Sequence, residues 1–150
     1  MLALAAVALA AVLPQHGVLV PGRFLGGVRL GETPAEVERK LGRFHGVCRG
    51  CPATTWYFTY KRFTEQGLAV EFHKARVDAI YTLASPEGWS TAGGLDLGAP
   101  ATTLPPLRVT ACSGYKALVA RTPSAVTVYY VADAKLWGFG LLRPTAAICR

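Results

Sequence analysis

Apolar residues recur at helical spacing between residues 33 and 41. Val37 and Leu41 fall on one face of such a helix, and charged residues cover most of the remaining surface. Thr33 followed by Glu36 has the capping-box pattern, a proline occupies the first helical position, and a glycine comes directly after the last one. The sequence therefore predicts a short helix over about 33–41. Because so short a helix is marginal by itself, it must pack on another element through its apolar face.

Short segments further along the chain alternate apolar and polar residues, as half-buried strands do. Residues 67–73 show this pattern most clearly, with Leu68, Val70 and Phe72 on one face. Short links join neighbouring segments, which favours antiparallel pairing. The predicted strands are 56–60, 67–73, 76–84, 115–120, 125–131 and 135–142.

A five-residue pattern occurs twice along the chain. Residues 94–98 (Gly-Leu-Asp-Leu-Gly) repeat the form of residues 27–31 (Gly-Val-Arg-Leu-Gly), and three predicted strands come after each copy. Pro105 and Pro106 cannot lie inside a second helix, so we expect a single turn or an extended segment there. The two copies predict two half-units that share one sheet.

These patterns favour the α+β class. At 150 residues the chain is long enough for one domain with a substantial core. We expect a single domain over 18–150, with a mainly antiparallel sheet built from two degenerate repeats, about 27–84 and 94–143, and one short helix packed on one face of the sheet.

The order of these motifs resembles a known group of small exported modules. Val28 and Gly31, then Val37, then an aromatic strand and the alternating strand 67–73 resemble the bacterial outer-membrane assembly lipoproteins and the tandem-repeat β-lactamase inhibitor proteins. The resemblance implies a helical segment packed on an antiparallel sheet. It also implies non-catalytic work, because the inhibitor branch holds another protein on its open sheet face. No lipid-anchor cysteine is present near the N-terminus, which favours a soluble form, and no functional residue carries over from the resemblance.

The first residues of the chain are strongly apolar. Leu2 to Leu13 is an unbroken run of alanine, leucine and valine, which is too short to span a bilayer and matches the apolar part of a secretory signal. We therefore expect residues 1–17 to be a signal-like segment and the mature chain to be secreted or to lie in the cell envelope, without a transmembrane segment. The alternative is a buried apolar helix.

Four cysteines, an even number, fit an oxidising compartment. Four cysteines allow three pairings. We expect Cys48 to pair with Cys51 and Cys112 with Cys149, the second pair fixing the C-terminal segment.

Two other interpretations of the first cysteine pair remain open. Together with His45, Cys48 and Cys51 have the ligand types and spacing of part of a zinc site, but His73 is the only distant candidate for a fourth ligand. A redox Cys-x-x-Cys motif would ordinarily lie in a βαβ setting, which the sequence does not predict. No nucleophile with a partnered base is recognisable either. We expect no metal, no cofactor and no catalytic residue.

The chain is basic, with 16 Lys and Arg against 9 Asp and Glu, a formal net charge of +7 and a pI near 9.5. Six bases and no acid lie between Arg39 and Arg62. This excess can steer an acidic partner or an anionic surface towards the protein, or serve solubility alone. Nucleic acid is not an expected partner, because no binding motif accompanies the charge.

Aromatic residues recur in the predicted strands, and an exposed face that carries them would suit a protein partner. The alternative is that they fill the core. The candidate partner-binding residues are Trp56, Tyr60, Tyr129, Trp137, Phe139 and Arg62.

These observations predict an exported, non-catalytic module that binds a protein or a cell-envelope component through an aromatic, basic sheet face. The alternative is a small envelope enzyme, either a thiol oxidoreductase that uses Cys48 and Cys51 or a hydrolase. A β-lactamase inhibitor proper is a further possibility that the resemblance raises.

Overall fold

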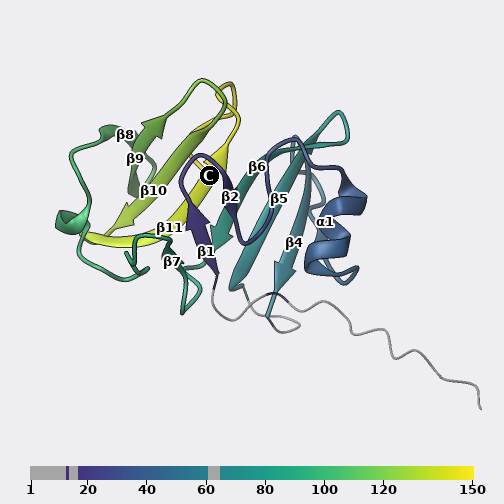
Figure 1. Ribbon diagram of the computed structural model, residues 1–150, viewed down its shortest axis with the longest axis horizontal. Coiled ribbons are helices and arrows are strands. Elements are labelled where there is room, and N and C mark those ends of the chain that lie inside the picture. The colour runs from purple at the N-terminus through teal and green to yellow at the C-terminus, as the bar shows by residue number, and fades with distance from the viewer. Residues whose placement is uncertain (1–12, 14–16, 61–64) are drawn as a thin grey trace, which may run out of the picture.

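The computed structural model describes residues 13, 17–60 and 65–150, and these residues form an α+β fold (Figure 1). The centre is an antiparallel sheet whose strands, in spatial order, are β3 (Gly46–Val47), β4 (Thr54–Thr59), β5 (Gly67–His73), β6 (Arg76–Leu83), β11 (Lys135–Leu142), β10 (Val126–Ala132), β9 (Tyr115–Arg121) and β8 (Arg108–Cys112). A small second sheet contains β2 (Phe24–Leu25), β1 (Val18–Val20) and β7 (Ser90–Thr91). The predicted fold class is confirmed.

All six predicted strands are present, and 67–73 and 135–142 have the predicted bounds. β8 and the short strands β1, β2, β3 and β7 were not predicted from the sequence. Each of these four short strands has only two or three residues, which is too few to show an alternating pattern. No helix among the described residues has the length and apolar character needed to cross a membrane.

The helix α1 (Pro34–Leu41) forms as its capping signals predict. The Glu36 carboxylate accepts a hydrogen bond of 2.7 Å from the Thr33 amide, and the Thr33 hydroxyl accepts one of 3.3 Å from the Glu36 amide. Val37 and Leu41 are buried against the sheet. The hydrogen bonds from the Thr33 backbone and side chain lower the pKa of Glu36.

Replacing Thr33 with alanine is expected to destabilise the protein by about 1 kcal/mol, because one helix-end amide loses its partner. The lowered pKa of Glu36 adds a pH dependence. A depressed carboxyl pKa stabilises the fold above the ordinary Glu pKa, and this stabilisation is lost as the pH falls through the lowered value. Urea unfolding of the wild type and of Thr33→Ala from neutral to acidic pH measures both effects. If the difference in the free energy of unfolding between the wild type and Thr33→Ala grew as the pH falls, the capping role would be contradicted.

The two halves of the main sheet share one plan. Each half is a four-stranded antiparallel meander, and β6 pairs with β11 where the halves meet. The Gly31 amide donates to the Val77 carbonyl at 2.8 Å, and the Gly98 amide donates to the Leu136 carbonyl at 2.7 Å. The register shifts once in β5–β6 and once in β10–β11. The repeated sequence pattern therefore marks equivalent positions in the two halves.

The two halves differ in the segment directly after the repeated pattern. The first half continues into α1, whereas the second continues into a single 3-10 turn, η1 (Ala101–Thr103). This is the single turn that Pro105 and Pro106 predict, because prolines inside a longer helix would remove hydrogen bonds and clash with the preceding turn.

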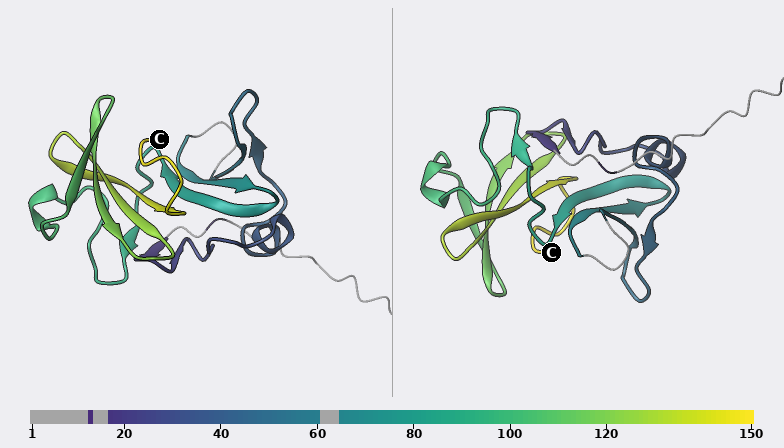
Figure 2. Two further views of the ribbon diagram at one scale, coloured as in Figure 1. Left: turned by 90° about the horizontal axis from the view of Figure 1, so that it is seen from above. Right: turned by 90° about the horizontal axis from the view of Figure 1, so that it is seen from below.

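Two apolar cores lie on opposite sides of the main sheet, and Figure 2 shows α1 and the N-terminal strands on one side and the C-terminal end on the other. We call the side with α1 the helix face. Phe58, Val70 and Ile80 lie in its core with the fully buried Trp89. We call the other side the tail face, because residues 143–150 cross it. Ala146 and Ile148 of this tail pack against the second core.

Both predicted disulfides are present. Cys48 pairs with Cys51 between β3 and β4, with the two Cα atoms 5.7 Å apart. Cys112 at the end of β8 pairs with Cys149, with a Cα separation of 5.6 Å, and so fixes the tail to the sheet. Apart from Leu13 and Gly17, the predicted signal-like segment lies outside the described residues.

Candidate functional site: an aromatic pocket on the tail face

The six predicted partner-binding residues do not form one surface. Phe139 is fully buried and Tyr129 is 8% exposed, so the prediction of an exposed position is wrong for both, and both belong to the core of the helix face. Trp56 and Tyr60 are half-buried and pack against the same core, and Tyr60 accepts a hydrogen bond from the indole of Trp89. Trp56 and Tyr60 therefore contribute to the core, which is the alternative to partner binding that the sequence left open. Arg62 lies outside the described residues.

Trp137 is the predicted residue that remains exposed, at 42%. Strict alternation would place it on the same face as Phe139, two positions along β11. The register between β10 and β11 shifts between Tyr130 and Val131, beside Trp137, and such an irregularity re-aims side chains. Trp137 consequently lines a cavity with Tyr130, while Phe139 is buried on the helix face.

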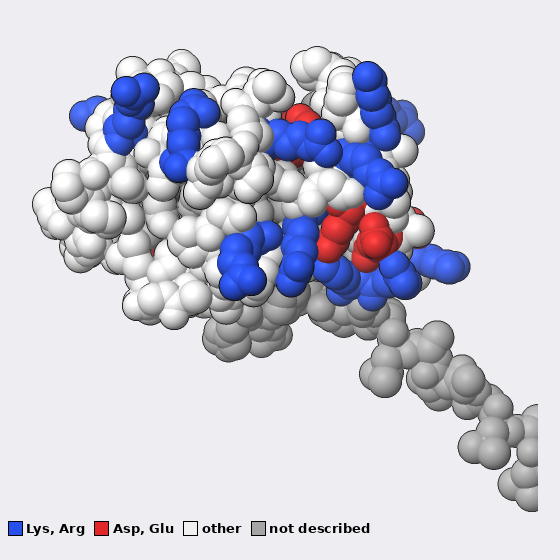
Figure 3. Space-filling view, turned by 45° about the horizontal axis from the view of Figure 1, so that its top comes forward, with Lys and Arg blue, Asp and Glu red and all other residues white. Residues whose placement is uncertain are grey.

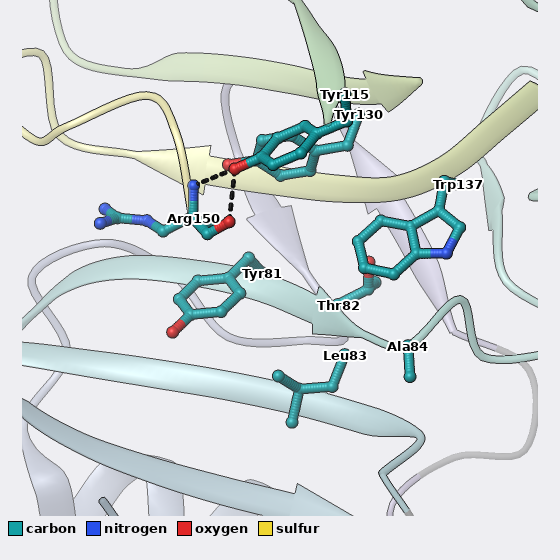
Figure 4. A pocket seen from close by; sticks show the side chains of 8 residues that line it. All are labelled: Tyr81, Thr82, Leu83, Ala84, Tyr115, Tyr130, Trp137 and Arg150. Atoms are coloured by element: carbon teal, nitrogen blue, oxygen red, sulfur yellow. Dashed lines mark hydrogen bonds between the residues drawn. The ribbon is translucent and has the colours of Figure 1, made fainter. Parts of the chain in front are cut away.

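The cavity has a volume of about 160 Å³ and lies on the tail face, where the two halves meet (Figure 4). Residues at the end of β6, on β9, β10 and β11, and in the tail surround it. Its walls are mainly aromatic and aliphatic. The lining residues are Tyr81, Thr82, Leu83, Ala84, Tyr115, Tyr130, Trp137 and Arg150.

Two glycines of β11 allow close packing here, Gly140 against Tyr130 and Gly138 against Thr82. A Cβ atom at Gly140 would lie 3.0 Å from the Tyr130 hydroxyl oxygen, and one at Gly138 would lie 2.8 Å from the Thr82 hydroxyl oxygen. The Tyr130 ring therefore lies over bare backbone, which is the close packing that glycines within a strand permit. From this position the Tyr130 hydroxyl donates to the Ile148 carbonyl at 2.9 Å and holds the tail.

Arg150 closes one end of the cavity. Its backbone amide donates to the Tyr115 hydroxyl at 2.6 Å, and that hydroxyl also donates to the Arg150 carbonyl. The guanidinium lies 3.5 Å from the Glu71 carboxylate and 5.4 Å from the centre of the Tyr81 ring. Figure 4 shows Arg150 and Trp137 on opposite sides of the pocket, with the tyrosines between them. The site thus combines an apolar wall with one arginine side chain, whose charge is paired with Glu71.

The hydroxyls of Tyr81 and Tyr130 remain neutral. Burial raises the pKa of Tyr130, and burial together with the nearby Glu71 carboxylate raises the pKa of Tyr81. Both hydroxyls are therefore protonated at neutral pH and act as hydrogen-bond donors rather than as bases. The chemistry that this arrangement offers is the binding of an apolar group.

The Cys48–Cys51 hairpin lies apart from this pocket, at the other end of the main sheet. The two sulfur atoms are bonded to each other, and the His45 ring stacks on Trp56 with the ring centres 3.9 Å apart. The His45 Nε2 atom is 3.4 Å from the Glu38 carboxylate. Among the described residues no group of three or more His, Cys, Asp or Glu side chains is placed to hold a metal ion.

Most of the pocket residues were not predicted from the sequence. Tyr81, Tyr115 and Arg150 carry no pattern that separates them from other strand or terminal residues. One signal was available: Gly138 and Gly140 alternate in β11 and leave one face of the strand bare beside a tyrosine pair in β10. A bare stripe next to an aromatic residue indicates close packing of that ring across the strand.

Comparisons with protein-family models, with curated proteins and with solved structures find no match to this chain.

Proposed function

We propose that the protein is an exported, non-catalytic binding module that engages a protein or a cell-envelope component through the tail-face pocket. Two disulfides support an oxidising compartment. The basic excess supports an acidic partner, and Lys and Arg side chains outnumber Asp and Glu on the face that Figure 3 shows.

The observation that carries this proposal is the position of Trp137. Trp137 is 42% exposed although it lines an apolar cavity, and tyrosines line the wall next to it. Tryptophan, tyrosine and arginine are the residue types that most often dominate binding energy when a partner covers them. The pocket offers all three within one small surface, and it can receive an aliphatic or aromatic side chain of the partner.

Replacing Trp137 with alanine is expected to weaken partner binding by about 2 kcal/mol, or roughly thirtyfold in affinity, and to leave the fold intact. A partner captured from the native extracellular medium and identified by mass spectrometry would be titrated against both proteins by calorimetry. The resemblance in sequence pattern makes a β-lactamase the first purified partner to test.

Val109→Ala is the matched control, because Val109 is 57% exposed on β8, away from the pocket. The control is expected to bind like the wild type. Equal affinities of the wild type and Trp137→Ala would exclude the pocket as the binding site. An equal loss in both variants would show that the effect is not local to the pocket.

A further inference from the structure

A second exposed surface lies at the outer edge of the first half, around β3. Phe44 is 88% exposed and Val47 is 57% exposed, and Arg43 and Arg49, close to them in the chain, are exposed as well. We call these four residues the edge patch. β3 is the terminal strand of the main sheet, whereas the pocket is built on β6, β9, β10 and β11. The edge patch is therefore a separate surface.

The edge patch belongs to a firmly held hairpin. The disulfide between Cys48 and Cys51 closes the turn, and the Cys48 amide donates to the Thr55 carbonyl at 2.9 Å. His45, next to Phe44, turns inward and stacks on Trp56 with an interplanar angle of 16°. Phe44, directly before His45, is in contrast 88% exposed. The disulfide and the stack of His45 on Trp56 thus hold the hairpin that follows Phe44.

The charges of the edge patch are not neutralised by the described part of the protein. Arg39 and Lys40 of α1 pair with Glu36 and Glu32. Arg43 and Arg49, in contrast, have no ion-pair partner within the described ranges of the chain. The sequence has no acidic residue between Glu38 and Glu65. Two cations therefore flank two exposed apolar side chains.

We propose that the edge patch docks the protein on an anionic phospholipid surface. Phe44 and Val47 enter the interfacial layer, and Arg43 and Arg49 contact lipid phosphates. Such a surface supplies negative charge above a deformable apolar layer, so it can receive a protruding ring without a preformed cavity. A protein partner would have to supply both a pocket for Phe44 and acidic groups around it. This inference goes beyond the proposed function, because it concerns a different surface of the molecule.

Vesicle flotation tests this proposal with phosphatidylcholine vesicles that contain or lack phosphatidylglycerol. The wild type is expected to bind only the vesicles with phosphatidylglycerol, and added salt is expected to weaken this binding. Phe44→Ser should lower the partition coefficient on the order of tenfold, because an apolar ring no longer leaves water. Arg43→Glu combined with Arg49→Glu should abolish the binding.

Arg108→Glu combined with Arg121→Glu is the matched control, since it makes the same change in net charge at the opposite end of the sheet. This control should retain most of the binding. If both double charge variants lost vesicle binding equally, binding would depend on overall charge, and the proposal would be overturned. Undiminished vesicle binding by Phe44→Ser would overturn it as well. Binding to neutral and anionic vesicles alike would also overturn it. Absence of vesicle binding together with binding to polyglutamate would assign the edge patch to an acidic protein instead.

Discussion

Replacing Trp89 with alanine is expected to lower the free energy of unfolding by about 3–5 kcal/mol, the range for truncating a large buried aromatic residue. Trp89 is fully buried and is the largest side chain in the core of the helix face. Its ring fills the space beside Gly17 and Gly26, where an added Cβ would come within 2.2 and 3.1 Å of the ring. Alanine leaves a cavity that the surrounding strands cannot close.

Trp89 also joins parts of the chain that are far apart in sequence. Its indole donates to the Tyr60 hydroxyl, and the Trp89 carbonyl accepts from the Leu97 amide at 2.9 Å. Trp89→Phe keeps most of the ring volume and loses the side-chain hydrogen bond, so it should cost less than Trp89→Ala. Denaturant unfolding monitored by circular dichroism gives both values. Trp137→Ala is the control, because Trp137 is half-exposed. If it lowered the free energy of unfolding as much as Trp89→Ala does, the dominant role of Trp89 in the core would be contradicted.

Removing the Cys112–Cys149 disulfide by a double replacement with serine is expected to destabilise the protein by about 4 kcal/mol on the chain-entropy model. This disulfide links residues 37 positions apart, whereas Cys48 and Cys51 are three apart. The short Cys48–Cys51 loop restricts the unfolded chain much less, so its removal should cost about 2 kcal/mol. The two double variants thus compare the stability contributions of a long and a short disulfide loop within one protein.

The same replacement should also loosen the tail that covers the tail face. Without the disulfide, the tail is held by hydrogen bonds to Tyr115 and Tyr130 and by the apolar contacts of Ala146 and Ile148. Amide hydrogen exchange in residues 143–150 should accelerate in the Cys112 and Cys149 variant and not in the Cys48 and Cys51 variant. Unchanged exchange in the tail would show that its non-covalent contacts suffice. A larger stability loss in the Cys48 and Cys51 variant would contradict the loop-length argument.

Local signals in the sequence determined the helix and six strands. Thr33 and Glu36 satisfy helix-end amides by themselves, and Val37 and Leu41 form the apolar stripe, so this helix is encoded within ten residues. The strand 67–73 is encoded in the same way by the alternation of its side chains. The repeat of residues 27–31 at 94–98 likewise predicted two half-units that share one sheet, and in the structure Gly31 and Gly98 hold equivalent positions beside β6 and β11.

The sequence also predicted the two disulfides, but not the surface that the second one creates. Even cysteine numbers and an apolar N-terminal run favoured pairing. The consequence of pairing Cys112 with Cys149 depends on where residues 143–150 lie. They cross the tail face and bring Arg150 against Tyr81 and Tyr115. No short-range pattern carries that information, because the contacts join positions separated by tens of residues.

The tertiary structure alone decided which aromatic residues are exposed. Trp137 and Phe139 have the same spacing as two residues on one strand face, yet one lines a cavity and the other is fully buried. The sequence determines the period of a strand, but burial depends on the layer that packs on each face and on the register shift between neighbouring strands. The helix, the strands and the cysteine pairs are therefore encoded in the sequence, while the aromatic pocket arises where the two halves and the tail meet.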